Sequence, residues 1–479
     1  MKNSIVAYQT RLFQLMFGLF LLLLGIYAVN SMSLGSAKTA KMLGGWILIF
    51  AFVLALDRRY WILLPFLYHF GISIPALPFN STEIGCLVVV ATHFVRLGLH
   101  RDKAIVWNRP LLLSIPVLVW IAYIFSLNPV GMNLFGSSTI GGRFYFDIAL
   151  AYFTLFSLAS LRFDEQDAKL LFHILVLGML LALLRGVVFP QFDPDDSDAI
   201  GEAYASRSTR YAFIPCANLF MLLVCRYGLS EVVHSLGLAF LSVLLVLGAI
   251  YSGKRRTLVF IAGTPVLRSL ITGKDRLLTA LFGFLAAFFL VFAVLADGTF
   301  ISLPRSAKRV LAVVVPKYQE QGFEGYKDKF REQVHRYAYD IIKESPWVGR
   351  KGFAMSREET IWMHFGGGKT GLYGGHAYSG NWHGLWLAFA ADFGLPGAFL
   401  WGLCYLSIIF YAAKAVKIVT QGVWLPVCCM YFSISFLIGF VFSWTSGHSA
   451  QSTLDIFWLF GLLLACVRGY QESHGMVVR

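Results

Sequence analysis

Residues 277–296 read LLTALFGFLAAFFLVFAVLA, a run of apolar and small side chains without a single charge. A helix that crosses a bilayer needs about 20 such residues, because lipid offers no partner to exposed backbone groups. Similar runs recur along the chain, so the sequence predicts an all-α polytopic membrane protein with about 12–14 transmembrane helices. The predicted spans are 12–30, 42–56, 60–78, 82–98, 110–127, 144–161, 168–189, 211–228, 232–251, 257–272, 277–296, 384–412, 422–443 and 452–468.

The composition agrees with a protein surrounded by lipid. Hydrophobic residues make up 57% of the 479 residues and charged residues 14%, whereas soluble domains carry about 25% charged residues. A net charge of +14 would suggest nucleic acid in a soluble protein, but here much of it flanks the predicted spans. We therefore expect the lipid bilayer as a partner, and no nucleic acid.

The predicted spans contain few reactive side chains. The seven cysteines lie in or beside apolar runs and form neither a CxxC pair nor a Cys/His zinc spacing, so they are expected to be buried hydrophobic residues. Asp147, His173 and Arg185 are costly in lipid and are expected to face the bundle interior, with snorkelling as an alternative for Arg185.

The distribution of Lys and Arg predicts the topology. With the N-terminus inside, each inside loop has a cation in it or at its edge, which favours an even number of spans. Lys38 and Lys41, in an outside turn, are a small exception. The main predicted outside segments are 128–143, 190–210, 252–256, 297–383 and 444–451.

The outside segment 297–383 is the largest loop of the chain. It holds thirteen Lys or Arg against nine Asp or Glu, a net charge of +4 that suggests an anionic partner. Residues 325–345 show helical spacing of apolar side chains and are followed by Pro346, which predicts an amphipathic helix that ends there. The glycine-rich stretch 365–375 is either a lid over a site or plain disorder.

Cations and histidines gather on the predicted outer face. Arg binds diphosphates well, because its donors are fixed and its charge is permanent, and His is the usual base for a sugar hydroxyl. The turn Ser252–Arg256 carries three adjacent cations; it either binds an anion or lies on the cytoplasmic side after a misplaced span. The candidate residues are Arg207, Arg210, Arg255, Arg256, Arg331, His376 and His383.

Three segments resemble the O-antigen ligase and O-antigen polymerase superfamily. Arg331 to Gly349 resembles its Arg-x3-Trp-x2-Ala-x2-Ile-x4-Pro-x2-Gly pattern, with His335 in place of Trp. His383 and the later Phe393–Gly397 resemble its His-Asn-x2-Leu and Gly-Leu-x-Gly elements, although Gly384 replaces the Asn. Ser252–Arg255 resembles its Ser-Gly-Ser-Arg turn. The resemblance covers residues 205–470.

The resemblance implies a glycosyltransferase of the outer face of the bacterial inner membrane, active without metal or cofactor. Its donor would be an undecaprenyl diphosphate-linked glycan. Its acceptor would be another carrier-linked glycan in a polymerase, or lipid A-core in a ligase, and the sequence leaves that choice open. The active site would face the periplasm.

The same resemblance assigns roles to the candidate residues. His383 and Arg331 would be catalytic, His383 as the base or as a group that orients the acceptor, with His376 as a rival for the base. The diphosphate would be bound by Arg331 and Arg255, with Arg256 beside them. A further family Arg precedes a Phe-x2-Pro-Asn element, matched loosely here by 213–218, and either Arg207 or Arg210 would fill that place.

These expectations divide the chain into N-terminal transmembrane helices, 1–204, and a ligase- or polymerase-like region, 205–479, that includes the loop 297–383. The main alternative is a transporter, such as a flippase for lipid-linked glycans. Transporters commonly show internal repeats, and this chain shows neither a repeat nor an even division. A structural or sensory membrane protein would not need Arg and His gathered on one face.

Overall fold

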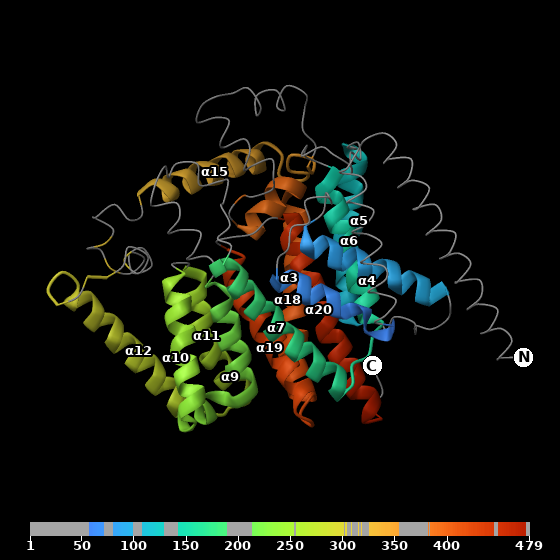
Figure 1. The fold of residues 1–479 in the computed structure, drawn as a ribbon. Helices are drawn as coiled ribbons and strands as arrows, with labels where there is room; N and C mark the ends of the chain where they lie inside the picture. The colour runs from blue at the N-terminus through green and yellow to red at the C-terminus, as the bar shows by residue number, and fades with distance from the viewer. Residues whose placement is uncertain are drawn as a thin grey trace, which may run out of the picture.

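The computed structural model describes residues 57–70, 80–98, 108–128, 142–188, 213–252, 255–300, 302–303, 308, 315, 318, 325–353, 382, 384–444 and 449–475. The elements in this part of the chain are all helical (Figure 1). They are η1 (Asp57–Ile62), α3 (Leu63–Phe70), α4 (Ser81–Gly98), α5 (Arg109–Leu127), α6 (Gly142–Ala159), α7 (Glu165–Val188), α9 (Pro215–His234), α10 (Leu236–Tyr251), α11 (Arg255–Thr272), α12 (Arg276–Ala296), α15 (Gly325–Glu344), α18 (Leu385–Ile418), α19 (Trp424–Phe442) and α20 (Ser449–Ser473).

The predicted class, an all-α polytopic membrane protein, is confirmed. Every predicted span from 60–78 onward coincides, wholly or in part, with a helix, while 12–30 and 42–56 lie outside the described residues. Six described helices are long and apolar enough to cross a membrane, namely α5, α7, α9, α18, α19 and α20. Shorter apolar helices lie within α6, α10, α11 and α12.

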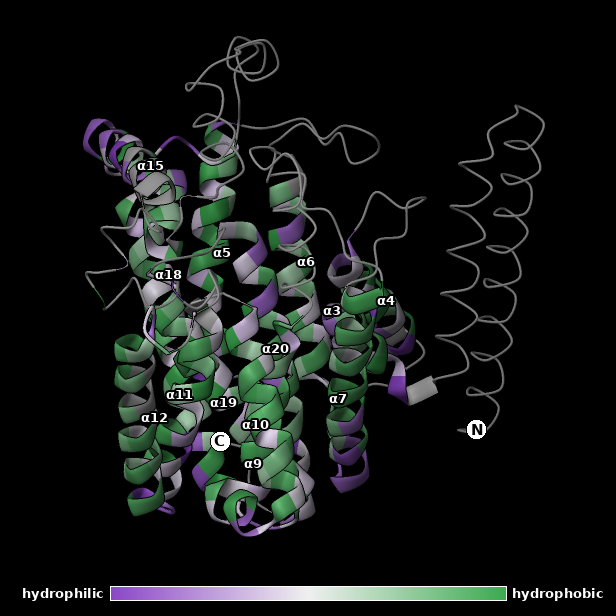
Figure 2. Cartoon of the chain, turned by 60° about the vertical axis from the view of Figure 1, so that its left-hand side comes forward, coloured by the Kyte–Doolittle hydropathy of each residue, from purple (hydrophilic) through white to green (hydrophobic). Residues whose placement is uncertain are grey.

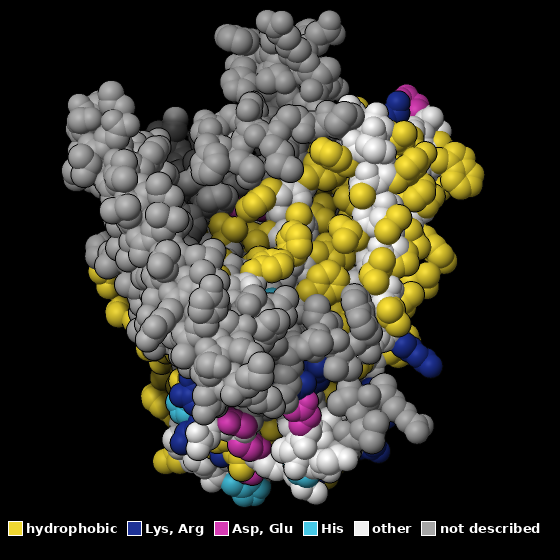
Figure 3. All heavy atoms as spheres, turned by 90° about the vertical axis from the view of Figure 1, so that its right-hand side faces the viewer, with side chains coloured by type: hydrophobic (Ala, Val, Ile, Leu, Met, Phe, Trp, Pro, Cys, Tyr) yellow, Lys and Arg dark blue, Asp and Glu magenta, His cyan; other side chains and the backbone are white. Residues whose placement is uncertain are grey.

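The surface of the bundle suits a bilayer. Figure 2 shows hydrophobic residues along the length of the bundle helices and hydrophilic residues concentrated near their ends and on α15. On the face drawn in Figure 3, hydrophobic side chains lie above a lower end where charged and histidine side chains gather. Helix α12 exposes apolar side chains along its whole length, from Leu277 through Phe284 to Leu295. Such side chains would be costly in water and are solvated by lipid.

Helix α20 lies in the core, and most of its residues are buried. It packs mainly on α6, with further contacts to α18 and α19. Backbone contact tightens this packing where Phe163 N–H donates to the Ala465 carbonyl at 3.1 Å. All seven cysteines are buried and free of disulfides, as predicted.

Two glycines interrupt long helices. The backbone leaves the helical conformation at Gly228 in α9 (φ 78°, ψ 164°) and at Gly394 in α18 (φ 76°, ψ 173°). These dihedral angles are open almost only to glycine. A Cβ at Gly394 would also overlap the Trp347 carbonyl. The break at Gly394, two residues before Pro396, therefore makes room for the segment that follows α15.

The predicted amphipathic helix is confirmed as α15, and Pro346 follows its end. It runs across one end of the bundle, which we call the α15 end (Figure 1). Its inner face, with Val334, Ala338 and Ile341, packs against Trp382 and against Ala388 and Ala391 of α18. The far end of the bundle is called the opposite end.

Candidate functional site

The α15 end is organised around one buried carboxylate, that of Asp392 in α18. Its side chain has no exposed surface. The Oδ1 atom accepts hydrogen bonds from Arg350 Nε at 2.8 Å and from Trp382 Nε1 at 3.0 Å. The Oδ2 atom accepts one from Ser449 Oγ at 2.8 Å, at the start of α20. Asp392 thus joins three segments that are far apart in the sequence, and the cation of Arg350 balances its charge.

Backbone groups extend this junction. Arg350 N–H donates to the Ala391 carbonyl at 2.8 Å and Gly352 N–H to the Asp392 carbonyl at 2.7 Å. In the other direction, Leu395 N–H donates to the Pro346 carbonyl at 2.8 Å. These contacts seat the turn 346–352 on the break in α18.

The sequence of α18 explains why these backbone groups are open to the turn. In an uninterrupted helix the Asp392 carbonyl would accept from residue 396, but Pro396 has no N–H. The break at Gly394 releases the neighbouring carbonyls as well, and Phe393 accepts from Trp120 Nε1 of α5 at 2.8 Å. Buried backbone groups need partners, and the turn and α5 supply them.

Aromatic rings surround the Arg350 guanidinium. It lies over the Trp382 ring at 5.5 Å and over the Phe353 ring at 5.9 Å. Phe353 packs against Phe144 and Tyr145 of α6 and against Phe393. The turn that follows α15 is therefore anchored to the N-terminal helices as well as to α18.

A second carboxylate anchors the beginning of the 297–383 segment. Asp297, next to the end of α12, accepts from Leu303 N–H at 2.8 Å, Tyr318 Oη at 3.0 Å and Lys308 Nζ at 3.0 Å. The Leu303 hydrogen bond, followed by those of Lys308 and Tyr318, lowers the pKa of Asp297 below its ordinary value. Burial and the contact with Asp297 raise the pKa of Tyr318 to about 12.

The turn between α10 and α11 is ordered by hydroxyl groups. Ser252 Oγ and Thr257 Oγ1 both donate to the Ala249 carbonyl, at 2.6 and 2.9 Å, and lie 3.2 Å from each other. Arg255 and Arg256 form the first turn of α11, and their side chains are outside the described residues. Because α11 and α12 are antiparallel neighbours, this turn lies at the same end of the bundle as Asp297.

The predicted catalytic residues are described in part. Arg331 lies in α15, one helical turn before Val334, and its side chain is outside the described residues. His383 is itself not described, but its neighbour Trp382 is buried against Val334 and Ala338. Helix α15 and the residue before His383 are thus in contact. The other predicted residues, Arg207, Arg210 and His376, and the stretch 365–375 lie outside the described residues.

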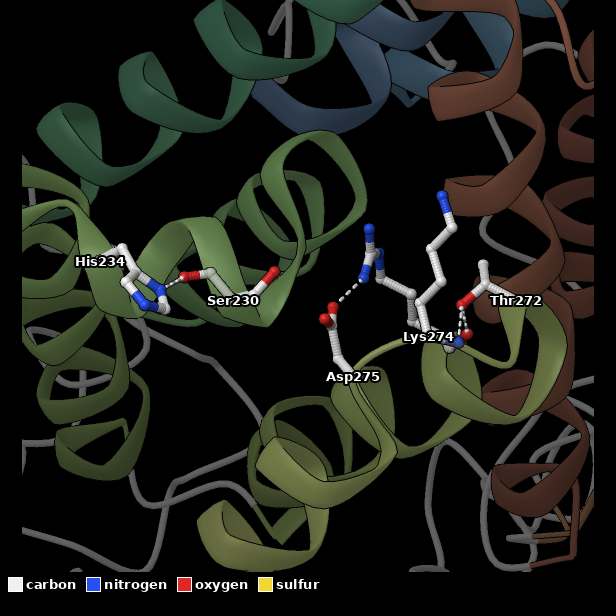
Figure 4. A network of polar contacts seen from close by, with 6 residues as sticks. Ser230, His234, Thr272, Lys274 and Asp275 are labelled. Carbon is white, nitrogen blue, oxygen red and sulfur yellow. Dashed lines mark hydrogen bonds and ion pairs between the residues drawn. The ribbon is translucent and has the colours of Figure 1, made fainter.

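The opposite end carries polar contacts of a different kind (Figure 4). Asp275, in the turn before α12, pairs with Arg268 of α11 at 2.7 Å. Burial acts to raise the pKa of Asp275, but hydrogen bonds from Ser230 and Arg268 outweigh it, and the pKa lies below its ordinary value. His234 Nδ1 lies 2.7 Å from the Ser230 carbonyl. These contacts tie α9, α11 and α12 together.

Other pairs hold the N-terminal and C-terminal helices together. Glu165 accepts from Val423 N–H at 3.0 Å and Trp424 N–H at 2.8 Å, so this α7 carboxylate caps α19. Within the N-terminal helices, Arg59 of η1 pairs with Asp167 of α7 at 3.1 Å. Carboxylates thus fix helix ends here without gathering several segments of one loop.

Two of the three ionisable residues predicted to face the interior are at least partly buried. Asp147 is 4% exposed, and Arg185 is partly buried over the Phe70 ring at 5.6 Å. The prediction for His173 is wrong, because this residue is exposed on α7. Its Nδ1 lies 2.6 Å from the Lys169 carbonyl and its ring packs beside Trp424, near the helix end. The local carbonyl partner satisfies the ring without burial.

Sequence reasoning missed Asp392, Arg350 and Ser449. The signal for Asp392 was present, because it is the one acidic residue within the predicted span 384–412. Among the residues that the structure describes, no group of three or more His, Cys, Asp or Glu side chains is arranged to hold a metal. No family model matches the chain, and no curated protein matches it.

Proposed function

We propose that this chain is a membrane glycosyltransferase of the O-antigen ligase or polymerase type. It moves a glycan from an undecaprenyl diphosphate carrier to a sugar hydroxyl at the periplasmic face of the bacterial inner membrane, without a metal. The α15 end of the bundle is then the periplasmic end.

One observation supports the proposal most directly. Two of the three segments that carry the resemblance, 331–349 and 383–397, are far apart in sequence and touch in the fold. The carbonyl of Pro346 accepts from Leu395 N–H, and α15 packs on the start of α18. A chance similarity in two unrelated loops would give no reason for this contact.

The chemistry follows from the residue types. The acceptor hydroxyl oxygen attacks the anomeric carbon, and His383 takes the hydroxyl proton as the new C–O bond forms. The bond from the sugar to the diphosphate breaks, and the carrier diphosphate leaves with the electron pair. Arg331 and Arg255, with Arg256 and either Arg207 or Arg210, bind the diphosphate and stabilise the charge that develops on it. His376 is the alternative base.

The test is glycan transfer by the purified protein in nanodiscs that contain an undecaprenyl diphosphate-linked oligosaccharide, with and without EDTA. Transfer should survive EDTA and fall by about 10²–10⁴-fold in His383→Ala, the usual contribution of a general base. Arg331→Ala should fall by about 10²–10³-fold, as for loss of one charge-stabilising donor.

Matched controls lie on the same elements or carry the same side chain. Arg336→Ala removes an exposed α15 cation that pairs with Glu332, and His234→Ala removes an exposed histidine of the opposite end. Both should retain transfer. Longer chains without added lipid A-core would identify a polymerase, and transfer to core alone a ligase. Carrier movement across vesicles without any transfer would reject the enzyme and favour a flippase.

A further inference from the structure

We infer that Asp392 is a positioning residue for this reaction. Its carboxylate fixes Trp382, the residue directly before His383, in register with the helix that carries Arg331. This inference rests on the proposed function, and it adds a residue that the resemblance does not supply.

The geometry of the Oδ1 atom carries the inference. Oδ1 accepts from both Arg350 Nε and Trp382 Nε1, and these two donors stand at either side of residues 351–381. The two donors also contact each other, because the Arg350 guanidinium lies over the Trp382 ring. The Oδ1 atom of Asp392 therefore holds Arg350 and Trp382, the two ends of this part of the loop, close together.

Trp382 passes this constraint on. Its ring has no exposed surface and packs against Val334 and Ala338 of α15, with Tyr337 at a centroid distance of 6.0 Å. Arg331 precedes Val334 by one helical turn on α15. Since successive Cα atoms are about 3.8 Å apart, His383 follows directly after the contact between Trp382 and α15. Asp392 thus fixes Trp382, the residue before His383, against the helix that carries Arg331.

Burial makes the arrangement specific to a carboxylate. An ionised group without exposed surface is costly unless it is paired and hydrogen-bonded, and Asp392 receives a cation and three hydrogen bonds. Asn has nearly the same shape, but its neutral amide oxygen accepts more weakly from Arg350 and leaves that cation without a counter-charge. Asp392→Asn therefore weakens the hold on the loop ends while preserving side-chain volume.

The experiment compares Asp392→Asn with the wild-type protein in nanodiscs. Per folded molecule, kcat should fall about 100-fold, the effect of a misplacement of about 1 Å at a reacting group. The KM for the carrier-linked donor should stay within about twofold, because the diphosphate-binding arginines are unchanged. A merely structural role would lower the amount of folded protein and leave the kcat of that fraction normal, which would overturn the inference.

A second measurement does not need transferase activity. The peptide bond after Lys351 is a trypsin site in the turn that Arg350 attaches to Asp392. Cleavage there should be at least about tenfold faster in Asp392→Asn, because local opening exposes the chain. If Asp392→Asn is cleaved faster but the wild-type protein transfers no glycan, the structural role of Asp392 is supported and the proposed function is rejected. Unchanged cleavage would overturn the inference.

Trp382→Phe is the variant to use if Asp392→Asn does not fold. It keeps the ring in the packed cluster and removes only the N–H donor to Oδ1. It should lower kcat and speed cleavage in the same direction, and normal values for both would overturn the inference. The matched control is Trp386→Phe in α18. This variant removes the 2.7 Å hydrogen bond that Trp386 Nε1 donates to Ser443 Oγ, and it should leave kcat and the cleavage rate unchanged.

Discussion

The two ends of the bundle are held together by different arrangements of charge. At the α15 end, Asp297 and Asp392 each bind three donors, and five of these six donors belong to the 297–383 segment, while Ser449 belongs to α20. At the opposite end, Asp275 binds Arg268 of α11 and Ser230 of α9, and Glu165 caps α19. One end ties a loop to helices, and the other ties helices to one another.

The two ends also differ in the burial of their ion-paired carboxylates. The Asp392 side chain has no exposed surface, whereas Asp275 retains 15%. Breaking a buried pair leaves an uncompensated charge, which costs more than the pair contributes. The α15 end should therefore be the more sensitive of the two to a single substitution, and the predictions below test that expectation.

The largest expected effect is a difference in maleimide labelling between the two ends of the bundle, which we expect to lie on opposite sides of the membrane. The native cysteines are all buried, so a single new cysteine at an exposed position can report on sidedness. Trp347→Cys, at the α15 end, should react with an impermeant maleimide added to intact cells with a permeabilised outer membrane. Lys274→Cys, at the opposite end, should react only after the inner membrane is opened. Reaction of both from one side would contradict the assignment of the two ends.

The next prediction compares the two ion pairs. Arg350→Met leaves Asp392 buried without its cation and should cost about 3–5 kcal/mol of unfolding free energy. Arg268→Met breaks the more exposed pair with Asp275 and should cost less, about 1–3 kcal/mol. Denaturant unfolding in mixed micelles measures both. Arg350→Met combined with Asp392→Leu should recover stability, and equal losses in the two single variants would refute the contrast.

Substitution of the two helix-breaking glycines gives a smaller contrast. Both have backbone angles that cost other residues about 1–3 kcal/mol, so this loss is common to Gly228→Ala and Gly394→Ala. At Gly394 the new Cβ meets the backbone of Trp347 and Val348, which cannot yield easily. At Gly228 it meets the end of the Arg268 side chain, which can move. Thermal unfolding in detergent should therefore show the larger loss for Gly394→Ala.

The smallest expected effect is a dependence on pH. The folded state lowers the pKa of Asp297, so its contribution to stability is full above the ordinary carboxyl pKa of about 4 and is lost as pH falls through the lower folded-state value. Asp297→Asn should flatten the loss of thermal stability as pH falls below about 4. Asp275→Asn should flatten it likewise, since its pKa is also lowered. A wild-type profile in either variant would count against the corresponding anchor.

Much of the fold could be predicted from sequence because lipid imposes a simple rule. Apolar runs long enough to cross a bilayer gave helices such as α5 and α19 within a few residues of their bounds. Helical spacing and Pro346 predicted α15. Each of these signals is local, and each is read from neighbours along the chain.

The organisation of the candidate site could not be predicted in the same way. The contact of Asp392 with Arg350 spans 42 residues and that with Ser449 spans 57, and no local pattern indicates which donor a buried acid will find. His173 was expected inside because ionisable groups avoid lipid, but a carbonyl one turn away satisfied its ring at the surface. The roles of Arg331 and His383 remain predictions from resemblance.

The break in α18 also bears on how such a protein could diversify. The turn after α15 attaches to α18 through the backbone of Arg350, Gly352 and Leu395, and backbone groups are the same whatever side chain a residue carries. Asp392 and its partners demand particular side chains, and Gly349, Gly352 and Gly394 leave no room for a Cβ atom. Other side chains of the turn 346–352 can therefore change in a related protein while the turn keeps its attachment to the membrane helices beneath.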